Sequence, residues 1–244
     1  MTKEWSQDTY ILIPSYKSVT PLTQFIGKLT EIVPKEYICV VDDASDDGTY
    51  EFCARQGIDC LRHDVNKGKG AALKTGFAHL TAIPQKNAKW ILTMDADGQH
   101  SPDDIHIFIE KARKHPDMGL CIGAREMRLG VMPPARILSN RLTSAFLSLL
   151  SWRHIRDSQC GYRMYSRELV KSVKLRYNRF EMESEIILKA AAKNFPIYFA
   201  GVRTLYLPGG GSHISHLSDT LRWIGAVARI WCNLKFGKTT ERGG

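Results

Sequence analysis

A short apolar run that ends in closely spaced acids constrains this chain most. Residues 90–94 have the length and composition of a buried strand, and Asp95 and Asp97 follow at once, separated by Ala96. In α/β proteins, ligands bind at the carboxyl ends of the strands. Carboxylate oxygens at this place suit Mg²⁺ or Mn²⁺. Two carboxylates leave the other coordination positions of the ion to water and a substrate diphosphate. The alternative for this stretch is a pair of solvated turn acids.

The same order of strand and acids occurs nearer the N-terminus. Residues 10–14 are an apolar strand candidate, residues 19–33 have a helical period, and residues 37–41 are a second strand candidate. Four acids then lie within residues 42–49. This alternation predicts an α/β fold with a mostly parallel, Rossmann-like sheet flanked by helices. For the four acids, a helix cap plus a turn is the alternative.

A basic, glycine-rich segment at residues 66–76 follows a third strand candidate and opens a helix. Glycine and lysine before a helix N-terminus are typical of an anion-binding loop, in which backbone N–H groups would support Lys69. The Walker A pattern is absent. Further helices are expected at residues 50–55, 101–115, 137–152, 167–173, 180–194 and 218–236, and further strands at 58–62, 119–123, within 157–165 and within 196–207.

Charge and cysteine content narrow the class of protein. The chain has 244 residues and a formal net charge of +9, which implies an anionic partner: nucleic acid, an acidic membrane surface or a phosphorylated substrate. Its six cysteines show no C-x-x-C spacing, so we expect reduced thiols and a cytoplasmic location. No signal peptide or membrane-spanning run is expected, because the N-terminus is polar and no eighteen-residue apolar window occurs.

The C-terminal segment is set apart by its pattern. Residues 218–236 combine an apolar face with Arg and Lys side chains and two tryptophans, Trp223 and Trp231. Such a helix can lie on an anionic membrane surface, which would make the protein peripheral on the inner face of the cell membrane. A surface helix packed on the core has the same pattern, and both alternatives stay open. We expect residues 1–216 to form the main domain and residues 217–244 an amphipathic helix and tail.

Taken in series, these motifs resemble those of the family 2 glycosyltransferases, whose nucleotide-sugar-binding fold is called GT-A. The resemblance covers roughly residues 8–215. It rests on Pro14-Ser15-Tyr16, the acids of residues 42–49, the glycine-rich segment and Asp95-Ala96-Asp97. Three later segments are similar to the dolichol-phosphate mannose synthase branch: Gly123-Ala124-Arg125, residues 136–140 and residues 157–165.

The resemblance implies transfer of a sugar from a GDP- or UDP-sugar to a polyprenyl phosphate. Matching positions imply a nucleotide-sugar site formed by Pro14, Tyr16, Asp43, Lys69, Asp95, Ala96 and Asp97. They imply a Mg²⁺ or Mn²⁺ site formed by Asp95, Asp97 and Gln99. They also imply an acceptor-phosphate site formed by Arg125, Arg136, Ser139 and His213. Asp97, Asp95 and Arg125 would be the catalytic residues. For Arg125 and Arg136 a solvated surface charge is the alternative, and for His100 and His213 a structural histidine.

This sequence departs from the branch at three places. Lys17-Ser18 replaces the usual Asn-Glu, which removes one nucleoside contact and leaves the donor base open. His213 stands where the eukaryotic enzymes have lysine, and Leu207 where they have arginine. The hydrophobic C-terminal spans of some relatives have no counterpart.

The acceptor determines which further groups the chemistry needs. A phosphate monoester is largely dianionic near neutral pH and needs no general base, so a single inverting displacement would rely on positioning and charge compensation. A sugar hydroxyl acceptor needs a base, for which Asp157 is the candidate. A non-enzymatic nucleic-acid-binding protein is the remaining alternative, but the chain has no RNA- or DNA-binding motif, so no nucleic acid is expected as partner.

Overall fold

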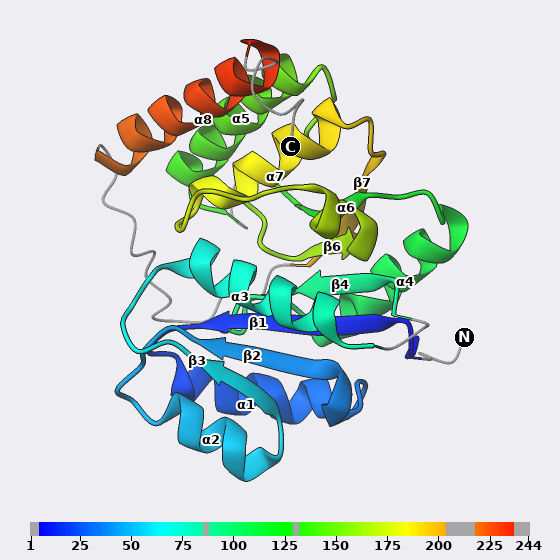
Figure 1. The fold of residues 1–244 in the computed structure, drawn as a ribbon, viewed down its shortest axis with the longest axis vertical. Helices are drawn as coiled ribbons and strands as arrows, with labels where there is room; N and C mark the ends of the chain where they lie inside the picture. The colour runs from blue at the N-terminus through cyan, green and yellow to red at the C-terminus, as the bar shows by residue number, and fades with distance from the viewer. Residues whose placement is uncertain (1–4, 85–87, 129–131, 204–217, 237–244) are drawn as a thin grey trace, which may run out of the picture.

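One mixed sheet organises the molecule (Figure 1). The computed structural model describes residues 5–84, 88–128, 132–203 and 218–236. Its seven strands lie in the order β3-β2-β1-β4-β6-β5-β7. They are β1 Thr9–Ser15, β2 Ile38–Asp42, β3 Asp59–Arg62, β4 Trp90–Thr93, β5 Leu120–Arg125, β6 Arg163–Ser166 and β7 Ile197–Val202.

Strand direction brings distant segments to one edge of the sheet. Strands β1 to β4 pair in parallel, and β5 pairs in parallel with β7. Strand β6 runs antiparallel to both of its neighbours, β4 and β5. The start of β6 therefore lies beside the ends of β4 and β5. The predicted α/β class with a mostly parallel sheet flanked by helices is confirmed.

Helices flank the sheet and gather at its two ends. In Figure 1, α1 and α2 lie together near β2 and β3, and α5, α7 and α8 lie together at the opposite end. The helices are α1 Val19–Thr30, α2 Thr49–Gln56, α3 Lys69–Ala82, α4 Ile105–Lys114, α5 Pro134–Ser151, α6 Arg167–Ser172, α7 Glu181–Ala192 and α8 Ser218–Phe236, with short 3₁₀ turns at Lys35–Tyr37 and Pro102–Asp104.

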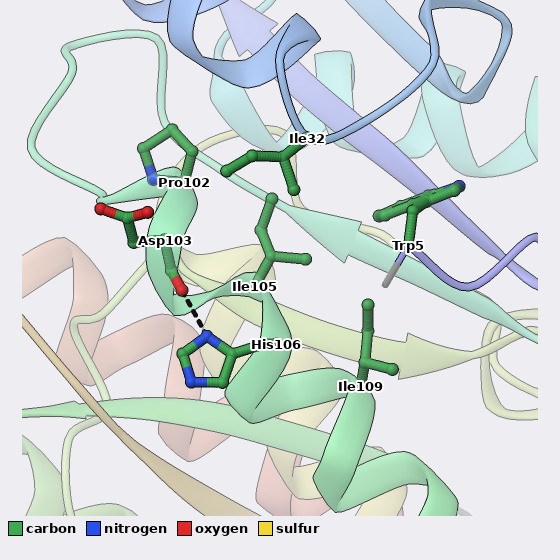
Figure 2. A pocket seen from close by; sticks show the side chains of 7 residues that line it. All are labelled: Trp5, Ile32, Pro102, Asp103, Ile105, His106 and Ile109. Carbon is green, nitrogen blue, oxygen red and sulfur yellow. Dashed lines mark hydrogen bonds between the residues drawn. The ribbon is translucent and has the colours of Figure 1, made fainter. Parts of the chain in front are cut away.

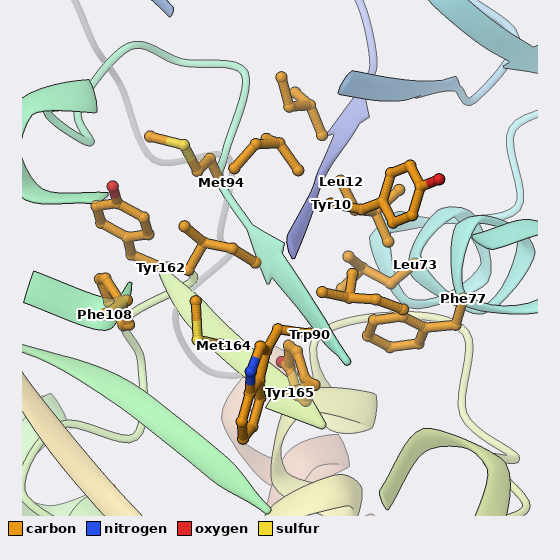
Figure 3. Packing of buried hydrophobic residues seen from close by; sticks show 14 of the residues in the cluster. Tyr10, Leu12, Leu73, Phe77, Trp90, Met94, Phe108, Tyr162, Met164 and Tyr165 are labelled. Atoms are coloured by element: carbon orange, nitrogen blue, oxygen red, sulfur yellow. The ribbon is translucent and has the colours of Figure 1, made fainter. Parts of the chain in front are cut away.

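The core fills both faces of the central strands (Figure 3). Helix α3 approaches β1 closely, because a Cβ atom at Gly76 would lie 2.2 Å from a methyl carbon of Leu12. Beside this contact, the rings of Phe77 and Tyr165 meet edge to face at 5.1 Å between centroids. Burying each such large apolar side chain contributes about 1.5–3 kcal/mol, so this layer fixes α3 on the sheet.

Several boundaries differ from the expected ones for local reasons. Helix α1 ends at Thr30 rather than at residue 33, before the helix-disfavouring position that precedes Pro34. Strand β2 begins one residue late because Lys35–Tyr37 forms a 3₁₀ turn. Helix α5 begins three residues early, with Pro134 in its first turn, where a proline needs no N–H partner.

The C-terminal helix packs on the rest of the molecule. Ala226, Val227 and Ile230 of α8 are buried. Trp223 Nε1 donates a hydrogen bond to Ser184 Oγ of α7 at 2.9 Å. The structure therefore favours packing for this face of α8 over membrane contact. The predicted domain boundary at residues 216 and 217 falls partly outside the described residues.

The six cysteines are free thiols in this structure. All six cysteines lie in described segments and none is in a disulfide. Burial raises the pKa of the Cys121 and Cys160 thiols to about 12, so both stay protonated. Within the described ranges, no helix is long and apolar enough to cross a membrane.

Candidate active site

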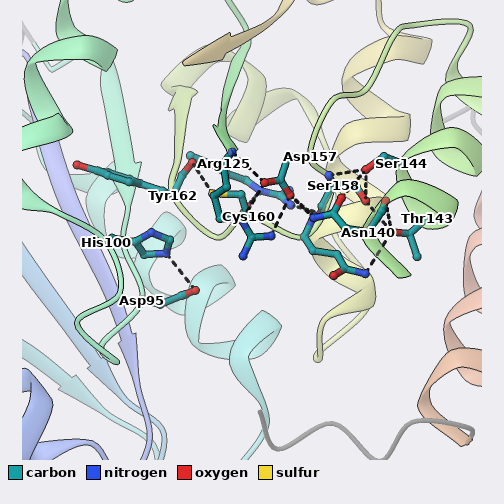
Figure 4. A network of polar contacts seen from close by, with 12 residues as sticks. Asp95, His100, Arg125, Asn140, Thr143, Ser144, Asp157, Ser158, Cys160 and Tyr162 are labelled. Carbon is teal, nitrogen blue, oxygen red and sulfur yellow. Dashed lines mark hydrogen bonds and ion pairs between the residues drawn. The ribbon is translucent and has the colours of Figure 1, made fainter. Parts of the chain in front are cut away.

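The two acids after β4 lie in different surroundings. Asp95 is partly buried, and its Oδ1 pairs with Lys69 Nζ at 2.7 Å. Its Oδ2 lies 3.3 Å from His100 Nε2 (Figure 4). Asp97 is exposed, and its Oδ1 accepts a hydrogen bond from the backbone N–H of Gln99 at 3.0 Å. The two acids therefore differ: Asp95 lies in a charged network, and Asp97 faces solvent.

These contacts separate the ionisation of the two carboxyl groups. Although burial opposes its ionisation, Lys69 and His100 lower the pKa of Asp95. Desolvation and the neighbouring negative charge of Asp95 raise the pKa of Asp97. Burial would lower the pKa of Lys69, but Asp95 and Glu183 raise it, so the ammonium group stays charged. The site thus carries a fixed cation beside its acids.

A glycine sets the position of Asp95. A Cβ atom added to Gly161 would lie 2.4 Å from Asp95 Oδ2, so the carboxylate occupies space that only glycine leaves open. Gly161 is in turn held by β4, because its carbonyl accepts a hydrogen bond from Thr93 Oγ1 at 2.8 Å. The following ring, Tyr162, packs against His100 at 4.9 Å between centroids. For His100, these contacts are those of a hydrogen-bonded structural histidine.

The donor groups after β4 fit a hard divalent cation. Asp95 and Asp97 offer carboxylate oxygens and Gln99 an amide oxygen, the ligand types that Mg²⁺ and Mn²⁺ prefer. Asp97 is open to solvent, where a diphosphate can approach. Lys69 already neutralises Asp95 in this structure. A cation at Asp95 therefore has to share that carboxylate with Lys69 or displace it.

The acids after β2 serve mainly the chain's own backbone. Both carboxylate oxygens of the buried Asp43 have partners. Oδ1 contacts His63 Nδ1 at 2.6 Å and accepts a hydrogen bond from the backbone N–H of Lys67 at 2.9 Å. Oδ2 accepts a hydrogen bond from the backbone N–H of Gly68 at 2.7 Å. Asp47 accepts the N–H of Val19, where α1 begins. For Asp47, the structure therefore agrees with the alternative that these acids cap a helix and form a turn. The nucleoside contact of Asp43 stays a prediction.

The glycine-rich segment makes internal contacts that the sequence did not predict. Two of its N–H groups bind the Asp43 carboxylate rather than an external anion. Gly70 allows close packing, because a Cβ there would lie 2.6 Å from the carbonyl oxygen of Arg179. The N–H of Ala71 donates to the carbonyl of Asn178 at 2.9 Å. The loop therefore holds an internal carboxylate and docks α3 on the segment before α7, and anion binding near Lys69 stays a prediction.

The predicted nucleoside residues lie at the same edge of the sheet. Pro14 is buried within β1, next to β4 in the sheet order. Tyr16 follows β1 and is 45% exposed, so its ring is available to a ligand. Lys17 Nζ lies 5.6 Å from the centre of this ring and pairs with Asp46 at 2.9 Å. Ala96 lies buried between the two acids after β4.

Arg125 is fixed by a buried carboxylate (Figure 4). Its Nε and one terminal nitrogen donate to the two oxygens of Asp157 at 2.8 and 3.0 Å, and its backbone N–H donates to the same group. Asn140 Nδ2 of α5 donates to Asp157 at 2.5 Å. Although burial opposes ionisation, Arg125 and Asn140 lower the pKa of Asp157. The carboxylate therefore joins β5, α5 and the turn before β6.

The other predicted acceptor residues lie at the start of α5. Arg136 is half-buried in the first turn and Ser139 is exposed one turn later. Ser139 Oγ accepts a hydrogen bond from Gln159 Nε2 at 3.1 Å. Strands β4 and β5 flank β6, which sets them about 10 Å apart. His213 lies outside the described residues.

Two residues to which the sequence analysis gave no role support the site. Glu183 of α7 is buried, and its carboxylate lies 3.2 Å from Lys69 Nζ. Arg163 is fully buried and donates to the carbonyls of Ser158, Cys160 and Glu183, which holds the turn around Gly161. Glu183 could not be found from the sequence, because its partner Lys69 lies more than a hundred residues away.

Two cavities of the described structure lie elsewhere. The one in Figure 2 measures about 10 Å³, room for about one water, and is lined by Trp5, Ile32, Pro102, Asp103, Ile105, His106 and Ile109. A second, of about 330 Å³, lies near the amino ends of β1 and β4, where Thr9 and Trp90 line it. The acids follow the opposite ends of these strands. Neither cavity includes a predicted site residue.

Two known proteins are similar in sequence over two thirds or more of this chain. A UDP-N-acetylglucosamine–dolichyl-phosphate N-acetylglucosaminyltransferase from Methanococcus voltae is 28% identical over 219 residues, 81% of this chain and 85% of that protein. An undecaprenyl-phosphate mannosyltransferase from Micrococcus luteus is 27% identical over 172 residues, 67% of this chain and 68% of that protein.

Among solved structures, the fold is similar to glucosyl-3-phosphoglycerate synthase from Mycobacterium tuberculosis in complex with Mn²⁺, UDP and phosphoglyceric acid. The TM-score is 0.68 at 16% identity, over 93% of this chain and 78% of that one. This likeness establishes the GT-A fold. The sequence model of glycosyl transferase family 2 matches residues 10–174, from β1 to just beyond α6. The chain therefore belongs to glycosyl transferase family 2.

Proposed function

We propose that this glycosyltransferase moves a sugar from a nucleotide-sugar to the phosphate of a polyprenyl phosphate, with inversion at the anomeric carbon and with Mg²⁺ or Mn²⁺ as cofactor. The observation that carries the proposal is the edge of the sheet where Asp95 and Asp97, which follow β4, and the fixed Arg125, at the end of β5, lie on either side of β6. The names of the two relatives, both polyprenyl-phosphate glycosyltransferases, support the acceptor class.

On the donor side, Asp95, Asp97 and Gln99 would hold the cation, and Pro14 and Tyr16 would contact the nucleoside. When bound, the cation supplies Lewis-acid neutralisation of the charge that develops on the departing nucleoside diphosphate. Lys69, which remains charged beside Asp95, would add a positive charge near the same oxygens.

On the acceptor side, Arg125, Arg136 and Ser139 would bind the phosphate. The Arg125 guanidinium is held in place by Asp157, so little side-chain freedom remains to be lost when an anion binds. Asp157 is unsuited to act as a base, because it is fully buried, its oxygens accept hydrogen bonds and its pKa is lowered. This argues against a hydroxyl acceptor and for an acceptor that is already ionised.

A lipid acceptor requires a membrane-facing surface, and α5 offers one. Leu138, Leu142, Leu149 and the following Trp152 are 60–82% exposed, and Arg141 and Arg153 are exposed beside them. Apolar side chains interleaved with cations suit an anionic membrane surface. We propose that α5, whose first turn carries Arg136, rests on the membrane. Residues 1–216 would form the catalytic unit and residues 217–244 an appended segment.

Transfer of label from nucleotide-sugars to polyprenyl phosphate in detergent tests the function. We expect labelled product in the organic phase with Mn²⁺ or Mg²⁺, and none in chelator. Asp97→Asn should lower the rate by about a hundredfold or more, since the cation contributes several kcal/mol to the transition state. Undiminished turnover in chelator would contradict the metal role, and transfer to sugar hydroxyls alone would contradict the acceptor.

Co-sedimentation with anionic vesicles tests the membrane surface. Leu142→Glu should reduce the bound fraction several-fold, because it places a charge among apolar side chains. The matched control is Gln56→Glu at the end of α2, which adds the same charge at the opposite end of the molecule. Equal loss in both variants would show that net charge alone governs binding.

A further inference from the structure

Three potential metal ligands from three elements meet at the amino ends of β2 and β3, opposite the edge that holds the candidate active site. Cys39 of β2 lies directly opposite Asp59 of β3 in the parallel ladder, and His79 of α3 lies over both. One ligand atom from each residue lies within 4.8 Å of the other two. His79 Nε2 and Asp59 Oδ2 are already paired at 2.7 Å.

The exposure of the three side chains allows an ion to enter from solvent. Cys39 is 1% exposed, whereas the side chains of His79 and Asp59 are 35% and 44% exposed. The thiol thus forms the floor of the cluster, and the imidazole and carboxylate form its open side. Burial and the charge of Asp59 raise the pKa of Cys39, so the thiol is protonated when no cation is present.

We propose that Cys39, Asp59 and His79 bind a divalent cation of borderline softness, such as Zn²⁺, with water in the fourth position. Thiolate, imidazole and carboxylate are the ligands of tetrahedral zinc sites, and a thiolate selects against Mg²⁺. On binding, the Cys39 thiol releases its proton to solvent, and the thiolate and carboxylate together balance the two positive charges. The cation would join β2, β3 and α3 at the end of the sheet.

This site is separate from the candidate active site and does not depend on the proposed function. Cys39 precedes Asp43 by four residues on an extended strand, which separates them by about 13 Å. The predicted donors at Asp95, Asp97 and Gln99 are all oxygens. A spectroscopic signal that requires sulfur therefore cannot come from the predicted active-site donors, and the cysteine variants show which thiol gives it.

Titration of the reduced, full-length protein with Co²⁺ tests the proposal. We expect a sulfur-to-cobalt charge-transfer band in the near ultraviolet that saturates at one equivalent. Cys39→Ser should abolish the band, and His79→Gln should weaken Co²⁺ affinity by about tenfold or more. The matched control is Cys60→Ser, because Cys60 follows Asp59 on the strand and its side chain points to the other face.

Because Cys39 is buried, its variant can fail to fold, and the partly exposed His79 then provides the decisive variant. Zn²⁺ at a hundredfold excess over its Kd should raise the Tm of the wild type by about 5 °C or more, and that of His79→Gln by clearly less. Absence of the charge-transfer band in the wild type, or a band of equal affinity in His79→Gln, would overturn the proposal.

Discussion

At the scale of single residues, the position of Asp95 depends on a missing side chain. A Cβ at Gly161 would lie 2.4 Å from Asp95 Oδ2, so Gly161→Ala should push the carboxylate out of place. We expect Mn²⁺ affinity to fall by about tenfold or more while the fold is kept. Calorimetric titration with Mn²⁺ measures this. Gly201→Ala is the control, because a Cβ at Gly201 has no neighbour within 4 Å.

Lys69 compensates two carboxylates, Asp95 at 2.7 Å and Glu183 at 3.2 Å. Lys69→Met removes this charge and leaves both acids without it, which should lower the free energy of unfolding by about 3 kcal/mol in chelator. Mn²⁺ should then raise the Tm of the variant more than that of the wild type, because the cation no longer competes with the ammonium group. Thermal unfolding with and without Mn²⁺ measures both effects, and an equal Mn²⁺ shift in the two proteins would contradict this account.

At the scale of elements, Asp157 ties β5 to α5 through Arg125 and Asn140. Its folded-state pKa is lowered below the unfolded value of about 3.9, so its stabilising contribution is complete above about pH 4. The contribution is lost as the pH falls through the lowered folded-state value. Asp157→Asn should cost about 2–4 kcal/mol at pH 7 and lose less stability in acid than the wild type. Urea unfolding from pH 7 to pH 2 tests this, and parallel pH profiles for the two proteins would contradict it.

Helix α8 is held on α7 by a buried side and by polar contacts. Val227 is fully buried, whereas its neighbour Ala228 is exposed. Val227→Asp should destabilise the protein by about 3 kcal/mol or more, because it buries an unpaired carboxylate, and Ala228→Asp should change stability by less than about 0.5 kcal/mol. Urea unfolding of the two variants compares them. Equal stability would mean that α8 does not pack on α7 in solution.

Three glutamates of α7 show why element contacts escape sequence reasoning. Glu181 pairs with Arg222 of α8 at 2.7 Å, Glu183 with Lys69 of α3, and Glu185 accepts the N–H groups of Arg176 and Tyr177. All three are buried. An alternation of acids at the start of a helix predicts favourable interaction with the helix dipole, but it does not predict three different partners.

At the scale of the whole molecule, the residue pattern of a short segment predicted its secondary structure but not which distant segments it pairs with. The apolar run at Trp90–Thr93 forms the expected buried strand, and the acids follow its carboxyl end. The antiparallel course of β6 was not predicted, because strand pairing depends on contacts between distant segments. The same limit applies to the glycine-rich segment: its glycines accommodate Asn178 and Arg179, more than a hundred residues later in the chain.

The candidate active site was likewise predictable only in part. Asp95 and Asp97 could be placed from spacing alone, since strand direction determines where they lie. The ion pairs of Lys69 with Asp95 and Glu183 could not be predicted, whereas its contact with a ligand anion stays a prediction. Family membership decides between an enzyme and a non-enzymatic nucleic-acid-binding protein in favour of the enzyme.

Under the proposed function, the acids after β4 bind a nucleoside diphosphate through a divalent cation. Calorimetric titration of the protein with UDP and with GDP, each in Mn²⁺ and in chelator, tests it most directly. We predict that at least one nucleotide binds in Mn²⁺, that binding in chelator is weaker by about a hundredfold, and that Asp97→Asn reproduces this loss. Equal affinity with and without Mn²⁺, or no binding of either nucleotide, would contradict the account.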